Sequence, residues 1–211
     1  ADILVATSSL DNYVDLSNNS SLTSLNCNNS NVDSLNLLNN PFLEILKCSN
    51  NNIDNLNLSN NSMLKYVECH VNNLQSLDFS NNTLLEILWC YDNNITSLDL
   101  SMCSSFVELN CENNQLTSLN LQNGSQGNNS FQPFFYINTI NNPNLFCIDV
   151  DDTSLPFWTS GYLVTESWTS ISTNCSLVLG CTDPLAPNYN PLATQDDGSC
   201  SIAAICSAPT G

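Results

Sequence analysis

Hydrophobic positions recur at a fixed period over residues 1–121. A typical unit ends in a polar turn of the SNN type and has apolar side chains at Leu43, Leu46, Cys48, Ile53, Leu56 and Leu58. The cysteine of this unit recurs every 21 residues and marks the register of the series: Cys27, Cys48, Cys69, Cys90 and Cys111. Such self-similarity predicts a solenoid, in which each repeat forms one coil that stacks on its neighbours.

Each coil is expected to hold one short strand at its LxC segment, and successive strands should stack into a parallel sheet about 4.8 Å apart. A coil buries about six apolar side chains, each worth about 1.5–3 kcal/mol. Ordering the backbone costs about 1–2 kcal/mol per residue, so one coil alone is unstable. We therefore expect stacking to be aided by a ladder of buried amides that pair with the turn backbone. These amides are Asn51, Asn72, Asn93 and Asn114.

The repeat LxxLxCxxNxLxxLxL resembles the leucine-rich repeat family in its short bacterial form. The resemblance covers about residues 1–121, including a looser first coil with Ala6 at the cysteine position. It implies a repeat solenoid, or superhelix, with a parallel β-sheet on its concave face. Extended and turn segments would form the convex face, with little α-helix. Ligands are expected on the concave face, where this architecture usually binds.

The cysteine ladder is predicted to be part of the core. In-register strands hold inward Cβ atoms about 4.8 Å apart, whereas a disulfide needs about 3.8 Å. Reduced thiols that pack as small hydrophobic side chains are therefore expected, with a metal-binding ladder as the alternative. The lone histidine, His70, directly follows Cys69. Consecutive strand residues point to opposite faces, which predicts Cys69 in the core and His70 on the surface.

The residues beside each inward leucine and cysteine form the outer surface of the predicted sheet. Both lysines and the single histidine fall there, together with three aromatic residues. Exposed aromatic side chains beside charged groups are typical of recognition sites and of sugar-stacking platforms. The alternative is that aromatic residues simply suit strands. The predicted binding residues are Ile45, Lys47, Lys65, Tyr66, Glu68, His70, Trp89, Tyr91 and Glu112.

The period breaks after Leu121, and residues 122–178 are expected to form an irregular last coil and a C-terminal cap. Residues 134–140 read as a further strand, and an LxC pattern returns at Cys147. A cap is needed because an open last coil would expose core and an unpaired strand edge. This segment resembles the closing cap of leucine-rich repeat proteins secreted by Bacteroidetes-type bacteria. The resemblance implies a Cys147–Cys175 disulfide.

Residues 179–201 contain the motif GCTDPLAPNYNPLATQDDGSC. It resembles a short module of large secreted proteins from the same bacteria, which implies export by the type IX route. A module this small needs a staple, so a Cys181–Cys200 disulfide is expected. Its oxygen-bearing side chains are candidate ligands for Ca²⁺, with turn formation as the alternative role. The candidate calcium ligands are Asp183, Asn188, Asn190, Asp196 and Asp197.

Two other cysteines have no evident partner in the sequence. Cys206 lies in residues 202–211, which are expected to be a linker to a further domain. Cys103 replaces the turn asparagine that other coils have at Asn40, Asn61 and Asn82.

Composition narrows the classes of function. The net charge is −18 with only two basic residues, which argues against nucleic-acid binding and against an anionic membrane surface. No apolar run approaches the roughly 20 residues needed to cross a bilayer. The eleven cysteines favour an oxidising, extracellular compartment.

Enzyme activity is not expected, because one surface histidine and buried thiols cannot form a catalytic set and no glycine-rich phosphate loop is present. The sequence therefore predicts a secreted or cell-surface recognition module, adhesion-like, that binds a protein or glycan on its concave face. The alternative is a structural spacer or self-associating subunit of an extracellular fibre.

Overall fold

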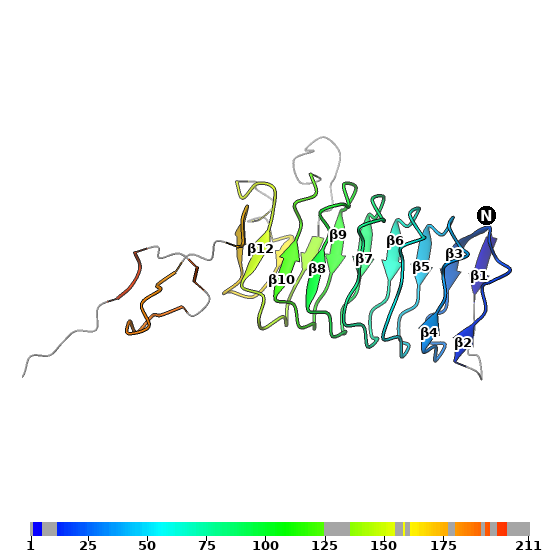
Figure 1. Cartoon of the computed structure of the whole chain (residues 1–211), viewed down its shortest axis with the longest axis horizontal. Helices are drawn as coiled ribbons and strands as arrows, with labels where there is room; N and C mark the ends of the chain where they lie inside the picture. Colours follow the sequence, from blue (N-terminus) through cyan, green and yellow to red (C-terminus); the bar gives the residue numbers. More distant parts are fainter. Residues whose placement is uncertain are drawn as a thin grey trace, which may run out of the picture. The chain divides into compact units, whose positions relative to one another are not determined.

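The computed structural model describes residues 2–5, 12–124, 136–154, 158, 161–176, 180–190, 193–194 and 198–201. The chain divides into two compact units, Ala1–Thr173 and Asn174–Gly211. The larger unit is a solenoid whose short strands follow one another along its length (Figure 1). The predicted fold class, a leucine-rich repeat-like solenoid of parallel strands with almost no helix, is confirmed.

The main sheet has eight parallel strands, one from each coil. In spatial order they are β1 (Asp2–Val5), β3 (Leu22–Asn26), β5 (Ile45–Lys47), β6 (Tyr66–Glu68), β7 (Ile87–Trp89), β9 (Glu108–Asn110), β11 (Tyr136–Asn138) and β13 (Leu163–Val164). Leu46 pairs with Val67 and Val67 with Leu88, so each inward side chain lies on its counterpart from the preceding repeat. In these coils the repeat period therefore sets the register.

A second sheet lies on the other side of the coils. Its order is β14 (Ser170–Ser172), β12 (Cys147–Asp149), β10 (Ser118–Asn120) and β8 (Ser97–Asp99). Towards the N-terminal end, β2 (Tyr13–Val14) pairs with β4 (Ser34–Leu35). The extended segments predicted for the convex face therefore pair as parallel strands in some of the coils.

The core runs through the stack of coils, with leucines such as Leu43, Leu64 and Leu85 fully buried. The predicted cysteine ladder is confirmed as free, buried thiols: Cys27, Cys48, Cys69, Cys90 and Cys111. Thr139 takes the next place in the ladder, since Asn110 pairs with Asn138 directly before it. Cys147 instead begins β12 of the second sheet, so its LxC pattern does not continue the ladder.

The predicted asparagine ladder is present. Asn93 Nδ2 donates to the carbonyl oxygens of Cys69 and Cys90, both at 3.1 Å, while Asn93 Oδ1 accepts from the Leu74 amide at 3.0 Å. Each such amide joins two coils and satisfies backbone groups that the turn leaves unpaired. The equivalent residues are Asn51, Asn72 and Asn114, and Asn142 adds a further step.

A second ladder of buried asparagine side chains links the SNN-type turns of successive coils. Asn61 Nδ2 donates to the carbonyl oxygens of Leu37 at 3.1 Å and Asn40 at 2.9 Å, and Asn82 repeats the arrangement on Asn61. Cys103 occupies the next position, buried, with its thiol 3.6 Å from the Asn82 carbonyl oxygen. The substitution noted in the sequence therefore lies inside the core.

The break in the period does not end the solenoid. Asn138 lies 28 positions after its partner Asn110 instead of 21, so this coil is longer in sequence than the repeats before it. The strand expected at 134–140 is present as β11, and β12, β13 and β14 continue both sheets to Ser172. Most of the segment predicted as an irregular last coil and cap, residues 122–178, thus belongs to the same unit as the repeats. That unit ends at Thr173, so residues 174–178 fall in the second unit.

Within the C-terminal unit, Cys181 and Cys200 form a disulfide, as predicted. Cys147 and Cys175 are also disulfide-bonded cysteines, and the chain has two disulfides near its C-terminus. Cys206 and residues 202–211 lie outside the described residues. In the described part of the chain, no helix has the length and apolarity to cross a membrane.

Candidate functional site

The outward side chains of the main sheet form a surface that we call the strand face. Its predicted rows are confirmed by the pairing of Ile45 with Tyr66 and of Lys47 with Glu68. Glu68 in turn pairs with Trp89. Of the predicted binding residues, the exposed or half-buried ones are Ile45, Lys47, Lys65, Tyr66, Trp89, Tyr91 and Glu112.

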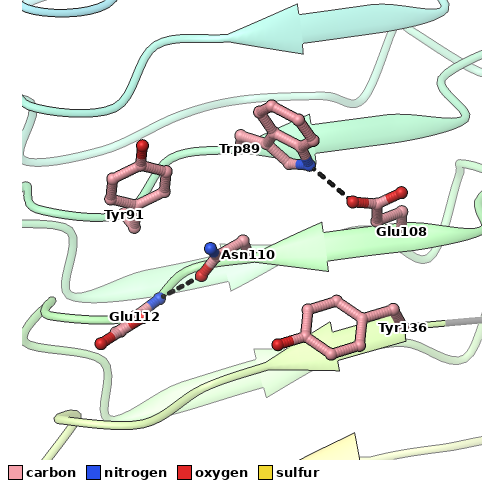
Figure 2. A pocket seen from close by; sticks show the side chains of 6 residues that line it. All are labelled: Trp89, Tyr91, Glu108, Asn110, Glu112 and Tyr136. Atoms are coloured by element: carbon pink, nitrogen blue, oxygen red, sulfur yellow. Dashed lines mark hydrogen bonds between the residues drawn. The ribbon is translucent and has the colours of Figure 1, made fainter. Parts of the chain in front are cut away.

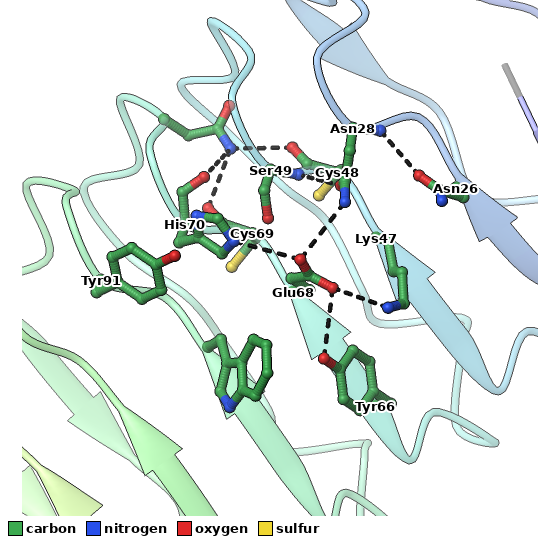
Figure 3. Close-up of polar contacts among 12 residues, drawn as sticks. Asn26, Asn28, Lys47, Cys48, Ser49, Tyr66, Glu68, Cys69, His70 and Tyr91 are labelled. Carbon is green, nitrogen blue, oxygen red and sulfur yellow. Dashed lines mark hydrogen bonds and ion pairs between the residues drawn. The ribbon is translucent and has the colours of Figure 1, made fainter. Parts of the chain in front are cut away.

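Glu68 is the centre of a polar network on this face (Figure 3). Its carboxylate is 3.1 Å from Lys47 Nζ and accepts hydrogen bonds from the Tyr66 hydroxyl at 3.3 Å and from Asn28 Nδ2 at 3.4 Å. The carboxylate also lies 3.3 Å from His70 Nε2. Groups from three successive coils therefore converge on one side chain.

Glu68 and His70 were both predicted to be exposed, and this is wrong: each is only 8% exposed. His70 does lie on the same outward side as Glu68, as strand alternation requires. It is covered because its ring stacks on Tyr91, with ring centroids 4.1 Å apart. Side chains from neighbouring coils thus bury residues that the alternation alone places at the surface.

Aromatic rings extend this network across the face. Tyr66 and Trp89 meet edge to face with centroids 5.7 Å apart, and Lys47 Nζ lies 5.0 Å from the centroid of the Tyr66 ring. These contacts fix the orientation of large side chains that remain half exposed. The surface offered to a partner is therefore largely preorganised.

A hollow of about 300 Å³ lies beside these rings, lined by Trp89, Tyr91, Glu108, Asn110, Glu112 and Tyr136 (Figure 2). Trp89 Nε1 donates to Glu108 Oε1 at 2.8 Å, and Asn138 Nδ2 donates to Glu112 Oε2 at 2.9 Å. In Figure 2, Asn110 lies between Tyr91 on one side and Tyr136 on the other.

Three residues of the hollow were not among the predicted binding residues: Glu108, Asn110 and Tyr136. Glu108 and Asn110 could have been found, because they share rows with Tyr66 and Trp89 at the repeat period. Tyr136 pairs with Glu108 across the longer coil, so the repeat period does not reveal its place.

Burial and charge shift several pKa values here. Burial raises the pKa of Glu68, but the hydrogen bond and charge of Lys47, with those of His70, outweigh it and lower the pKa overall. Burial, together with the negative charge of Glu68, raises the pKa of Tyr66. Burial also raises the pKa of Tyr91, as do Asp92 and Glu68. The carboxylate and both phenols thus hold their usual charge states at neutral pH.

Ser49, His70 and Glu68 have the residue types of a hydrolytic triad, but their geometry does not fit one. Ser49 is fully buried, and among the described residues neither its hydroxyl oxygen nor His70 Nδ1 has a hydrogen-bond partner. A nucleophile must reach both its base and the substrate.

The predicted calcium residues are only partly described. Asn188 is committed to a turn: its Oδ1 accepts from the Ser201 amide and its Nδ2 donates to the Ser199 carbonyl oxygen, both at 2.8 Å. Asp183 Oδ1 accepts from the Leu185 amide at 2.9 Å. The backbone amide of Asn190 donates to the Cys181 carbonyl oxygen, and Asp196 and Asp197 lie outside the described residues. Calcium binding stays a prediction.

No protein-family model matches the sequence, and no curated protein does. Among solved structures, the chain is similar to the functional domain of InlJ from Listeria monocytogenes, which includes a cysteine ladder. The TM-score is 0.60 and the identity 23%, over 78% of this chain and 38% of that chain. This chain thus covers well under half of the InlJ chain. The chain has the fold of a leucine-rich repeat solenoid with a cysteine ladder.

Proposed function

We propose that this chain is a non-catalytic recognition module that binds a protein or glycan partner on the strand face, outside the cell or at its surface. The observation that carries the proposal is a surface of half-exposed aromatic side chains that extends from β6 to β11 of the main sheet. Its residues are Tyr66, Trp89, Tyr91 and Tyr136. Rigid aromatic side chains give much contact area at a low cost in conformational entropy.

The contacts beneath these rings support a binding role. Trp89 is held by Glu108 and Tyr66, and Tyr91 by His70. Because these side chains already have fixed orientations, little freedom is lost when a partner binds. A surface of aromatic residues kept only for strand propensity would not need such polar supports.

The extracellular location is supported by the two disulfides, which persist in oxidising compartments. Secretion by the type IX route follows only from the resemblance of the tail motif and stays a prediction.

The test is an array of proteins and glycans probed with this chain and with the double variant Trp89→Ala, Tyr91→Ala. We expect at least one partner whose binding falls by tenfold or more in the variant, since buried aromatic anchors dominate interface energies. A matched control, Asp99→Ala in β8 of the second sheet, should bind as the unmodified chain does. The proposal is contradicted if every partner binds the double variant as well as it binds the unmodified chain, or if no partner is found.

A further inference from the structure

The positive charges of this chain are few, and all of their described contacts lie on the strand face. The sequence has two basic residues, Lys47 and Lys65, and one histidine. Lys47 pairs with Glu68, and Lys65 Nζ lies 2.8 Å from Glu44 Oε2. His70 also contacts Glu68. Both lysines and the histidine are thus engaged with one of two carboxylates.

The hollow beside Trp89 contains two other carboxylates, Glu108 and Glu112. Over the described residues, neither has a lysine or histidine within ion-pair distance. Their hydrogen bonds come from the neutral donors Trp89 Nε1 and Asn138 Nδ2. The chain has no further cation to supply, so the charge of this pair is left to solvent or to a partner.

The other walls of the hollow are aromatic. Trp89, Tyr91 and Tyr136 are half-buried, so each still presents part of its ring. Aromatic faces attract cations, and carboxylates attract them more strongly. The guanidinium of arginine suits both, because it stacks on rings and forms paired hydrogen bonds with carboxylates. The volume of about 300 Å³ suits one side chain better than an extended ligand.

We infer that the hollow of Trp89, Tyr91, Glu108, Asn110, Glu112 and Tyr136 receives a basic side chain, preferentially arginine, from a protein partner. This inference rests on the proposed function and names the chemistry of its partner. The net charge of −18 would further attract a basic protein surface and speed its association.

The experiment uses the whole chain, labelled with ¹⁵N, and three blocked heptapeptides of glycine and serine with a central arginine, lysine or glutamine. The indole N–H resonance of Trp89 is assigned with the Trp89→Phe variant and followed by NMR. We expect a saturable shift with the arginine peptide, weaker binding of the lysine peptide, and no shift with glutamine. The indole resonances of Trp158 and Trp168 provide an internal control.

Variants then test the role of the carboxylates. Glu108→Gln with Glu112→Gln keeps the side-chain shape and an acceptor for Trp89, and should weaken binding of the arginine peptide at least tenfold. Glu86→Gln, an exposed carboxylate of the neighbouring row, should change it less than twofold. Retained amide spectra and melting temperatures confirm that each variant is folded. Raising the salt to 0.5 M should weaken binding as well, since exposed charges are screened.

The inference is overturned if the arginine peptide produces no saturable shift, if the glutamine peptide binds equally well, or if the double variant retains full affinity. Failure of the proposed function is a separate outcome. The distinguishing result is an array partner, glycan or protein, that depends on Trp89 and Tyr91 but not on Glu108 and Glu112. That result would support the recognition function and reject the inference that the hollow binds a basic side chain.

Discussion

The imidazole ring of His70 stacks on the phenol ring of Tyr91 in the next coil, with centroids 4.1 Å apart and planes 8° apart. On its other side, His70 Nε2 contacts the Glu68 carboxylate. The buried His70–Glu68 pair therefore helps to hold the aromatic side chains of this face in place. Stability and recognition on this face depend on the same side chains.

Substituting Glu68 tests this support. We expect Glu68→Gln to lower the free energy of unfolding by about 1–3 kcal/mol, because the neutral amide loses the charge interaction with Lys47 in a mostly buried site. Urea denaturation at pH 7 measures the loss. The control Glu86→Gln is exposed and should stay within about 0.5 kcal/mol of the original.

The pH dependence gives an independent check on Glu68. Its pKa is lowered in the folded state, so its contribution is present above the unfolded value of about 4.5 and is lost as pH falls below it. The Glu68→Gln variant should therefore lose less stability than the original chain between pH 5 and pH 3. Parallel loss in both chains would show that Glu68 does not contribute in this way.

Val71 carries backbone strain. Its φ is 54°, in the left-handed region, where a β-branched side chain is unfavourable. The equivalent positions hold residues that tolerate this conformation: Asn29, Asn50, Asp92, Asn113 and Asn141. We expect Val71→Asn to raise the free energy of unfolding by about 1 kcal/mol. The reciprocal change Asn50→Val should lower it by a similar amount, and a neutral result for both would refute the strain.

Removing one step of the asparagine ladder should be costly. Asn93→Leu leaves the buried Leu74 amide without its acceptor. The carbonyl oxygens of Cys69 and Cys90 each lose one of two side-chain donors and keep those of Asn72 and Asn114. We expect a loss of about 1–3 kcal/mol, the cost of one buried donor left without an acceptor. The adjacent exposed residue provides the control, because Asn94→Leu should change stability by less than about 0.5 kcal/mol. Equal effects would mean that the ladder adds nothing specific.

The cysteine ladder should make the fold sensitive to alkali. Burial raises the pKa of Cys27 and of Cys111 to about 12, and that of Cys69 well above its usual value of 9.0. A raised pKa stabilises the fold below pH 9, and this contribution is lost as pH rises towards 12. Each thiol contributes up to about 1.4 kcal/mol per pH unit in that window.

The measurement is the free energy of unfolding from pH 8 to pH 10.5, compared with the variant Cys111→Ala. The variant is less stable at pH 8, because it leaves a small cavity, but its stability should fall less steeply above pH 9. Equal slopes in the two chains would contradict the prediction. Tyr66 and Tyr91 are unchanged in both chains and cancel in the comparison.

The sequence determined the solenoid because a constant repeat length allows only one register of stacking. The alternation of Leu46, Lys47 and Cys48 sets which side chains enter the core, and a spacing of 21 residues aligns them from coil to coil. The same logic correctly predicted the buried thiols and the amides of the first asparagine ladder. These features depend only on local alternation and period.

Tertiary structure decided what happens where the period ends and where side chains cross between coils. The 28-residue offset between Asn110 and Asn138 places Tyr136 beside Glu108, and no repeat count reveals that. Burial of Glu68 and His70 arises from Lys47 and Tyr91 on adjacent coils, whose conformations depend on packing. The sequence by itself therefore determined the scaffold and its outward face, while contacts between neighbouring coils decided which residues of that face remain open to a partner.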